Sequence, residues 1–361
     1  MARIIYGVQG NGRGHAVRAL TIARRLPRHE FLFLTHTDGL SVLGDEFPTV
    51  RCPNPETPVR SHRVAGLEMA LRNFGFWLKR SELLASVRGV FHAFKPDVAI
   101  TDYEYFVPLA SREYGIPCLS IDHQHIVTFW SHHVPLSQLP SYVGARFAAR
   151  FLFSAASHYL VVSFFRPASG GTGLNARLVP PLLRDLVIAR ASEDGDHVLA
   201  YQSTSTFQRF LPFLRSSGRP VLIYGLNDDR TEGNLTFRRY SEEGFLKDLA
   251  SSSYVICGGG HTLISEALFL GKPVISFPIS NIFEQFLNAH YLEKLGYGRC
   301  LMGFCPGQDI IPSFEAGLDQ YRANIRKGNF CGNEEIFTLV EDFIAGRKLD
   351  PPLPGHFLLS Q

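Results

Sequence analysis

The chain alternates short apolar runs of strand length with longer segments whose apolar residues recur at helical spacing. Strands are predicted over residues 3–8, 31–35, 95–102, 117–122, 158–163, 197–201, 221–224, 253–257 and 274–277. Helical spacing follows several of these strands, most clearly over 15–26 and 262–270. The alternation of strand and helix predicts parallel sheets covered by helices, which is the α/β class.

Length and composition predict two such domains, because 361 residues with 45% hydrophobic content can form two cores. The proline-containing segment 179–184 is predicted to be the linker between the two domains. We therefore expect an N-terminal Rossmann-like domain over 1–183, a C-terminal one over 184–346 and a tail over 347–361. The last helix, 334–344, is expected to pack across the seam between the domains.

Charge is distributed unevenly along the chain. Residues 1–180 hold 19 Lys and Arg against 12 Asp and Glu, whereas residues 181–361 hold 17 against 21, which together give the net charge of +3. A basic N-terminal half suits an anionic membrane surface or an acidic acceptor, and equally a solvated surface. Nucleic acid is not an expected partner, since the basic residues form no dense run.

The six cysteines lack a paired metal-ligand spacing and indicate reduced thiols. No apolar run reaches membrane-spanning length and the first residues already form a strand, so we expect a cytoplasmic protein without a signal peptide. Peripheral contact with the inner face of the membrane stays open. A helix over 64–94 carries Phe74, Phe76 and Trp77 near basic residues, and this aromatic face either rests on a membrane or packs on the sheet. The segment 51–63, rich in proline and arginine, is expected to be a mobile loop.

Three consecutive glycines at 258–260 separate the strand 253–257 from the helix 262–270. Such a turn leaves backbone N–H groups free at the positive end of the helix, which favours a bound phosphate. Glu266 lies in the first turns of this helix, where its carboxylate can accept hydrogen bonds from a ribose diol beside that phosphate. The alternative is a tight turn with a solvated glutamate.

A second glycine loop, 9–14, follows the first strand and leads into the helix that begins at His15. The helix dipole disfavours an imidazolium at this end, so His15 is predicted to stay neutral and able to accept a proton. The loop also resembles a loosened dinucleotide fingerprint. Gly10, Gly12 and Gly14 nevertheless lack the third glycine at its usual place, and Asp38 lies beyond the second strand. An NAD-binding oxidoreductase is therefore kept only as an alternative.

Asp102 ends the buried strand 95–102. Open α/β sheets place ligands at the carboxyl ends of their strands, so Asp102 is predicted to point toward the same crevice as His15. A carboxylate on one ring nitrogen fixes the tautomer of a histidine and stabilises the imidazolium that forms when the other nitrogen takes a proton. The competing interpretation is an N-cap for the helix that starts near Tyr105.

A cluster of histidines follows the strand 117–122, with His123 and His125 first and His132 and His133 after them. Acceptor recognition, a metal site and ordinary loop polarity are all open interpretations. Zinc is disfavoured because no carboxylate or cysteine spacing supports the imidazoles. We expect no metal, and we interpret His123 and His125 as a wall on the acceptor side.

The region from Gly258 to Gly298 resembles the donor-binding half of GT-B glycosyltransferases, closest to the MurG-type N-acetylglucosaminyltransferases and more distantly to the UDP-glycosyltransferases. The glycine turn, a glutamate on the helix, a Gly-x-Pro-Val strand, a Glu-Gln pair and an asparagine recur there in this order. The resemblance implies two doubly wound Rossmann-like domains facing across a cleft. Residues 202–205 follow the strand 197–201 and are expected to line this cleft opposite His15. The donor-binding residues that it implies are Gly12, Gly14, Gly259, Gly260, His261, Thr262, Glu266, Glu284, Gln285 and Asn288.

The same resemblance implies an inverting hexosyl or N-acetylhexosaminyl transferase. In the UDP-glycosyltransferases the histidine of the N-terminal glycine loop is the general base, which implies that His15, backed by Asp102, deprotonates a hydroxyl acceptor. The donor is then a nucleoside diphosphate sugar, with a UDP-sugar favoured, and no cofactor or metal is expected. Retaining relatives often carry a second glutamate eight residues from the first, and Gly258 and Val274 stand at those positions here. A lipid-linked or glycan acceptor fits the resemblance.

Two departures from the family pattern bear on the donor site. Gly258 and His261 stand where the UDP-glycosyltransferases have a phosphate-binding histidine and a tryptophan, so diphosphate contact falls to His261, Thr262 and the backbone. A sugar-nucleotide epimerase or hydrolase on the same fold is one alternative, although such epimerases carry adjacent glutamates after the glycines. A nonenzymatic nucleotide-sugar sensor is the other, and the presence of both His15 and Asp102 argues against it.

Overall fold

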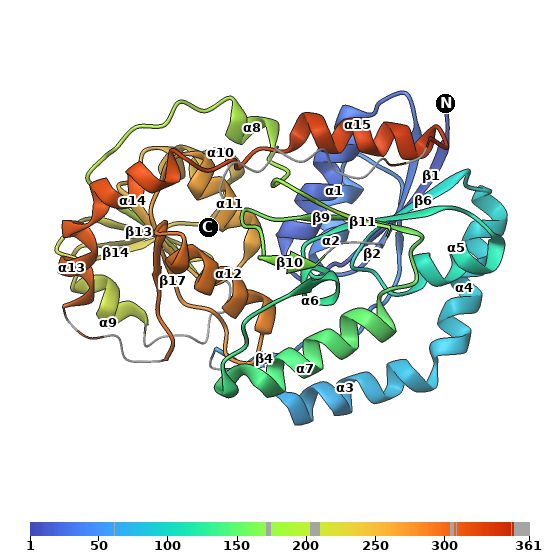
Figure 1. The fold of residues 1–361 in the computed structure, drawn as a ribbon, viewed down its shortest axis with the longest axis horizontal. Helices are drawn as coiled ribbons and strands as arrows, with labels where there is room; N and C mark the ends of the chain where they lie inside the picture. Colours follow the sequence, from blue (N-terminus) through green and yellow to red (C-terminus); the bar gives the residue numbers. More distant parts are fainter. Residues whose placement is uncertain are drawn as a thin grey trace. The chain divides into compact units, whose positions relative to one another are not determined.

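The computed structural model describes residues 1–60, 62–170, 175–202, 210–303, 307, 309–347 and 349. Within them the chain forms two compact units (Figure 1). The first comprises Met1–Pro58, Ala65–Arg184 and the described residues from Gly332 onward, and the second comprises Val59–Val64 and Asp185–Cys331. Residues 203–205 and most of the predicted tail lie outside the described part of the chain, so their predicted roles stay predictions.

The first unit is built on a seven-stranded parallel sheet with the order β11-β9-β7-β6-β1-β2-β3. Its strands are β1 (Arg3–Val8), β2 (Glu30–Thr35), β3 (Thr49–Arg51), β6 (Val98–Asp102), β7 (Cys118–Asp122), β9 (His158–Val162) and β11 (Ala176–Val179). The chain leaves β1 toward one edge through β2 and later returns beside β1 as β6. The switch point therefore lies between β1 and β6, and open sheets of this type bind ligands at the carboxyl ends of such strands.

Helices cover both faces of this sheet because the side chains of each strand alternate between two cores. Ile4, Tyr6 and Val8 of β1 belong to the core that holds α1 (Arg13–Arg25). Ile5 belongs to the opposite core, with α4 (Arg80–Phe94) and α5 (Phe106–Tyr114). The other elements of this unit are α2 (Asp38–Gly44), α3 (Gly66–Leu78), α6 (Ile126–Phe129), β8 (Trp130–Ser131), η1 (Leu136–Gln138), α7 (Leu139–Phe147), η2 (Ala148–Leu152), β10 (Ser169–Gly170) and α15 (Asn333–Ile344).

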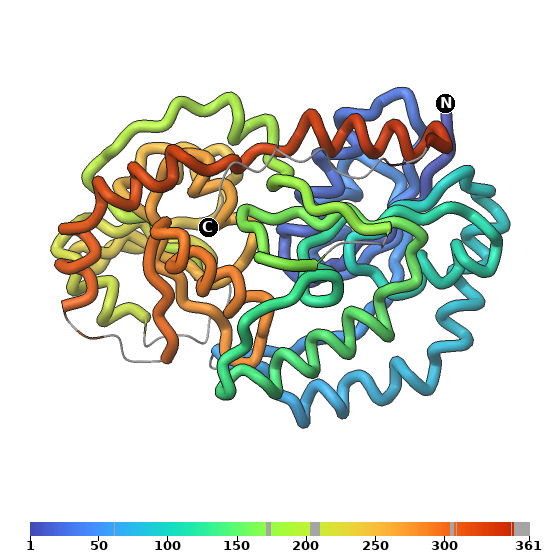
Figure 2. The backbone as a smooth tube through the Cα atoms, in the orientation of Figure 1, coloured from blue at the N-terminus to red at the C-terminus, as the bar shows by residue number. Residues whose placement is uncertain are grey.

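The C-terminal helix α15 belongs to the first unit. The sequence analysis had placed it in the second domain and predicted that it packs across the seam between the domains. Figures 1 and 2 show it in red beside the blue N-terminal segment. Its apolar face, which includes Ile336, Val340 and Phe343, joins the same core as α1. The side chain of Asn333 also accepts a hydrogen bond from the Leu183 N–H at 2.9 Å and donates one to the Leu183 carbonyl at 2.8 Å. Burial of this face fixes where the helix packs.

The second unit contains another seven-stranded sheet, with the order β14-β15-β13-β12-β16-β17-β18. It is parallel except for the antiparallel pair β14 and β15. Its strands are β12 (Val198–Tyr201), β13 (Val221–Tyr224), β14 (Arg230–Glu232), β15 (Leu235–Phe237), β16 (Tyr254–Cys257), β17 (Val274–Ser276) and β18 (Gly298–Cys300). Its helices are α8 (Asp185–Ile188), α9 (Phe210–Arg215), α10 (Glu242–Ala250), α11 (His261–Phe269), α12 (Phe283–Lys294), α13 (Ile310–Ala316) and α14 (Leu318–Ile325). The switch point lies between β12 and β16, directly before the three glycines.

Two expectations about the segment between 51 and 94 are corrected by the structure. The long helix is divided at Lys79, whose ψ of 7° leaves the helical region, into α3 and α4. The segment expected to be a mobile loop contributes the short antiparallel strands β4 (Val59–Arg60) and β5 (Arg63–Val64) to the second unit. There the buried ring of His62 places its Nε2 2.9 Å from the carbonyl oxygen of Phe277.

Candidate active site

The N-terminal glycine loop delivers His15 to the first turn of α1, next to the switch point of the first sheet. Gly12 precedes the helix with a φ of 82°, a left-handed conformation that suits glycine. Its N–H donates to the Asp38 carboxylate at 3.1 Å, and the Asp38 N–H donates to the carbonyl of Gly10 at 3.1 Å. The carboxylate that a dinucleotide site would use for ribose is therefore engaged by the loop itself.

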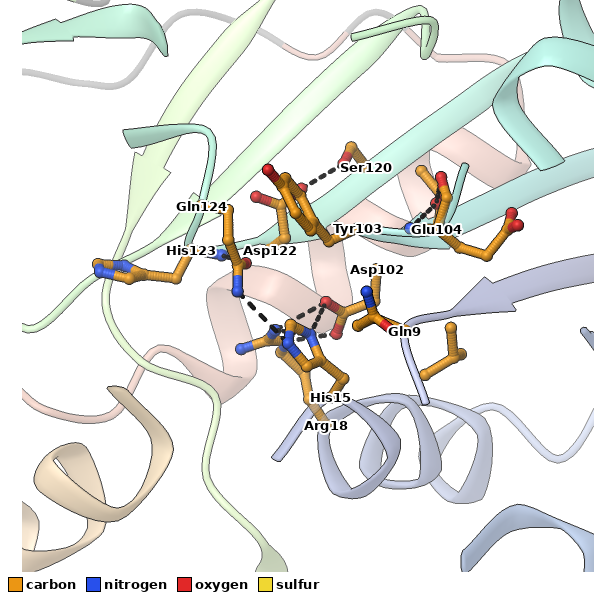
Figure 3. A network of polar contacts seen from close by, with 12 residues as sticks. Gln9, His15, Arg18, Asp102, Tyr103, Glu104, Ser120, Asp122, His123 and Gln124 are labelled. Carbon is orange, nitrogen blue, oxygen red and sulfur yellow. Dashed lines mark hydrogen bonds and ion pairs between the residues drawn. The ribbon is translucent and has the colours of Figure 1, made fainter. Parts of the chain in front are cut away.

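His15 and Asp102 meet at the carboxyl end of β6, with 2.7 Å between His15 Nδ1 and Asp102 Oδ1 (Figure 3). The carboxylate is fully buried, whereas 16% of the His15 side chain is exposed. An ionised carboxylate only accepts hydrogen bonds, so Nδ1 carries the ring proton and Nε2 carries the lone pair. This is the arrangement that a general base requires, and the two residues were brought together as the sequence predicted.

Arg18 completes this cluster, and the sequence analysis did not identify it. Its Nε lies 2.7 Å from Asp102 Oδ2 and its Nη2 lies 2.8 Å from Asp102 Oδ1, which is a bidentate ion pair. Burial opposes the charged form of the guanidinium, but the neighbouring Asp102 outweighs this effect and raises the pKa of Arg18. The missed signal was spacing, because residues three apart on a helix share one face and Arg18 follows His15 by three.

The competing role for Asp102, that of a helix N-cap, is filled by another residue. Glu104 accepts hydrogen bonds from the N–H groups of Phe106 at 2.8 Å and Val107 at 2.6 Å, at the start of α5. Because Glu104 satisfies these helix N–H groups, the Asp102 carboxylate stays committed to His15 and Arg18.

The loop after β7 presents Gln124, rather than either flanking histidine, to His15 (Figure 3). His123 and His125 are 1% and 0% exposed. The Nδ1 of His123 donates to the Val162 carbonyl at 2.7 Å, and that of His125 donates to the Asp122 carboxylate at 2.7 Å. This burial corrects the expectation that the two imidazoles form a wall on the acceptor side. In Figure 3 the ring of His123 points away from His15.

These histidines also do not converge on a common point. The third member of the predicted cluster, His132, donates from Nε2 to the Ile126 carbonyl at 3.0 Å. Among the residues that the structure describes, no three His, Cys, Asp or Glu side chains gather closely enough to hold a metal ion. Within the same residues, no helix combines the length and the apolar composition needed to cross a bilayer.

In the second unit, the glycines at 258–260 connect β16 to α11 next to the switch point. A side chain at Gly259 would meet the Gln285 carbonyl oxygen at 2.5 Å, so this close approach requires glycine. Asn288 donates from Nδ2 to the Gly259 carbonyl at 2.9 Å, and Gln285 Oε1 accepts from the Ile279 N–H at 2.9 Å. These two residues, which were predicted to bind the sugar donor, therefore hold the turn and the loop beside it.

The other predicted donor residues of this unit lie on α11 and α12. Gly260 is exposed at the N-terminal end of α11, His261 is buried in its first turn, and Thr262 is half-buried. Glu266 is 2% exposed in the second turn, and Glu284 is half-buried in the first turn of α12. The structure thus brings the glycine turn, Gln285 and Asn288 into direct contact, and it places Glu266 on the helix that the turn precedes.

Comparison with known proteins agrees with this geometry. Residues 2–306 match the model of the family described as glycosyl transferase family 1. An uncharacterized glycosyltransferase of Methanosarcina acetivorans is 24% identical over 96% of this chain and 99% of its own length. The solved structure of the calicheamicin glycosyltransferase CalG4 has a TM-score of 0.67 at 15% identity and covers 97% of this chain and 100% of that one. MurG of Acinetobacter baumannii has a TM-score of 0.60 at 15% identity, covering 95% and 100%.

Proposed function

Because the chain belongs to glycosyl transferase family 1, we propose that it transfers a sugar from a nucleoside diphosphate sugar to a hydroxyl acceptor. The proposed donor is preferentially a UDP-sugar, and the transfer is proposed to invert the anomeric configuration. A hexose or an N-acetylhexosamine is the proposed sugar, and a glycan or lipid-linked hydroxyl is the proposed acceptor. The observation that carries the proposal is the contact of 2.7 Å between His15 Nδ1 and the buried Asp102 carboxylate, which leaves Nε2 able to take a proton.

In the proposed reaction His15 is the general base. Its Nε2 takes the proton of the acceptor hydroxyl while the acceptor oxygen forms a bond to the anomeric carbon. The bond between that carbon and the diphosphate oxygen breaks, and the diphosphate leaves with the electron pair. Asp102 stabilises the imidazolium that forms. A single displacement of this kind inverts the anomeric configuration and needs no metal or other cofactor.

The donor is proposed to bind at the glycine turn of the second unit. The first N–H groups of α11 and the dipole of that helix favour the negatively charged diphosphate, also when it departs. His261 and Thr262 extend this contact. Glu266 is proposed to accept hydrogen bonds from the ribose hydroxyls, and Glu284, Gln285 and Asn288 contact the sugar directly or hold the turn that does. Gly12 and Gly14 form the corresponding loop beside His15 in the first unit.

Thermal unfolding with UDP, dTDP, GDP, ADP and NAD tests the donor class. A ligand that binds only the native state stabilises it by about 2.7 kcal/mol at a hundredfold excess over Kd, so UDP is expected to raise Tm by several degrees. Glu266→Ala is expected to abolish this shift. Glu266→Gln serves as a second variant because the side chain is buried, and Glu293→Ala on the exposed side of α12 is the matched control.

This test, together with a turnover assay on UDP-sugars, separates the candidate functions. A shift with NAD alone would return the N-terminal loop to the oxidoreductase interpretation. Release of free sugar from a UDP-sugar without an acceptor would favour a hydrolase, and conversion of the bound UDP-sugar to its epimer would favour an epimerase. Binding of UDP and of UDP-sugars without any turnover would favour a sensor.

Peripheral contact with a membrane is proposed through the outer face of α3. Leu67, Leu71, Phe74 and Leu78 recur at helical spacing, and they are 79%, 69%, 64% and 68% exposed. Trp77 is 37% exposed beside them, and the exposed Lys79 follows at the end of the helix. Phe76, by contrast, faces inward and packs against Phe106 of α5 with 5.5 Å between ring centroids. An exposed apolar stripe with a basic end suits an anionic lipid surface.

Vesicles of phosphatidylglycerol are expected to bind the protein and to shift Trp77 fluorescence to shorter wavelength, since the other tryptophan, Trp130, is already buried. The double variant Phe74→Ser/Leu78→Ser is expected to bind at least about tenfold more weakly, because each exposed side chain loses more than about 1 kcal/mol of transfer free energy. Leu186→Ser, at a residue 41% exposed in the second unit, is the control. Equal binding by all three proteins would contradict the proposed surface.

A further inference from the structure

The lone pair of His15 that the proposed reaction uses already has a hydrogen-bond partner in this structure. The side-chain Nε2 of Gln124 lies 3.3 Å from His15 Nε2 (Figure 3). Because Nδ1 carries the ring proton, Nε2 is the acceptor and the Gln124 amide N–H is the donor. The Oε1 of Gln124 accepts a hydrogen bond from the backbone N–H of His123 at 3.3 Å. This contact is consistent with the amide group facing His15 through its nitrogen.

The loop that carries Gln124 is held in place on both sides. Asp122 accepts hydrogen bonds from the His125 N–H at 2.9 Å, from His125 Nδ1 at 2.7 Å and from the Ser120 hydroxyl at 2.5 Å. Burial alone would raise the pKa of Asp122, but the charge and hydrogen bonds of His125 lower it to about 2. The His123 ring is fixed to the Val162 carbonyl. Gln124, half-buried between two anchored histidines, is therefore aimed at His15 by a rigid turn.

An sp² ring nitrogen has a single lone pair, and a general base must lie within hydrogen-bonding distance of the proton that it takes. The acceptor hydroxyl and the Gln124 amide therefore compete for the same atom. When the hydroxyl occupies Nε2, the amide N–H loses its partner, which is costly in a partly buried site. A hydrogen bond from the amide to the attacking oxygen itself would withdraw electron density from the nucleophile. A second acceptor oxygen beside the attacking one avoids both penalties.

We propose that Gln124 is an acceptor-positioning residue, which caps the His15 lone pair in the free protein and binds the group adjacent to the attacking hydroxyl when the acceptor arrives. The inference rests on the proposed function, in which His15 is the base. The attacking hydroxyl donates to His15 Nε2 while the Gln124 amide N–H donates to the oxygen of the neighbouring hydroxyl, so the two side chains together bind two adjacent hydroxyl groups. The acceptor class that this geometry selects is a vicinal diol, as in a sugar ring, over an isolated alcohol.

A binding experiment tests this selection without any sugar transfer. The probes are trans-cyclohexane-1,2-diol and cyclohexanol, which differ by one hydroxyl group. In NMR titrations of the full chain, the Gln124 side-chain amide and the His15 ring signals are followed, and the amide is assigned from its loss in Gln124→Met. The diol is expected to produce half of the maximal shift at about fivefold lower concentration than cyclohexanol, as one added hydrogen bond allows. In Gln124→Met the two alcohols are expected to produce half of the maximal shift of the His15 ring signals at equal concentrations.

Two controls separate positioning from a structural role. Gln320→Met, at an exposed glutamine of the second unit, is expected to keep the diol preference. If Gln124→Met does not fold, Gln124→Asn replaces it, since the shorter amide does not span the 3.3 Å contact to His15 without moving the turn. The proposal would be overturned if the two alcohols gave half of the maximal shift at equal concentrations in the wild type. It would also be overturned if the diol kept its lower concentration in Gln124→Met. Because no donor is present, this result is independent of whether UDP-sugars are substrates.

Discussion

His15→Ala is expected to lower kcat for sugar transfer by about a hundredfold to ten-thousandfold, the usual contribution of a positioned general base. The physical reason is that the acceptor hydroxyl then loses the one group placed to take its proton as it attacks. Asp102 cannot replace the base, because its carboxylate is fully buried and bound by Arg18. The loss is expected mainly in kcat, since the imidazole acts in the transition state rather than on the donor.

The measurement is initial velocity with a UDP-sugar and a diol acceptor, combined with UDP-induced thermal stabilisation of the same variant. Donor binding is expected to be unchanged in His15→Ala, because the donor residues proposed here lie mainly in the second unit. His133→Ala, at an exposed histidine of the first unit, controls for the loss of an imidazole elsewhere in that unit. Full activity in His15→Ala would remove the base assignment and with it the mechanism, while loss of UDP binding would indicate a wider effect of the substitution.

The sequence predicted the central strands of both sheets because their apolar runs are short, continuous and bounded by turn residues. It did not predict the edge strands β3, β11, β14 and β18, which are only three or four residues long. It also predicted that His15 and Asp102 lie close together, since each position follows from a local rule: a histidine at the start of a helix and a carboxylate at the carboxyl end of a strand. The pairing of β1 with β6 sets Val8 opposite Asp102. The loop and helix that follow β1 then bring His15 to Asp102.

Features that depend on long-range packing were not predictable in this way. Nothing local indicates that residues 59–64 pair with the second unit or that α15 packs beside α1. In the loop after β7, the imidazoles of His123 and His125 attracted attention because histidine is chemically versatile. Their rings bind partners 39 and 3 residues away, and Gln124 between them contacts His15 instead. The central strands were therefore predictable from local pattern, whereas the contact between Gln124 and His15 depends on the tertiary structure.

Arg18→Met is expected to lower the free energy of unfolding of the first unit by about 3 kcal/mol, the cost typical of removing one partner from a buried ion pair. The guanidinium contacts both oxygens of a carboxylate that has no access to water. Its loss leaves the Asp102 carboxylate with the contact to His15 Nδ1 described above. Methionine keeps most of the volume, which limits the contribution of a cavity. Urea unfolding of the variant and the wild type measures the difference.

The double variant Arg18→Met/Asp102→Asn decides whether this cost is electrostatic. If it is, removing the carboxylate charge restores much of the lost stability, because residues in one ion pair couple strongly and their effects do not add. Arg24 lies on the same helix as Arg18 and forms an exposed ion pair with Glu46. Arg24→Met is therefore the matched control and is expected to cost less than about 1 kcal/mol. An equal cost for Arg18→Met and Arg24→Met would mean that Asp102 needs no second partner. Full additivity in the double variant would show instead that Arg18 acts through packing, and His15 would then be oriented by Asp102 alone.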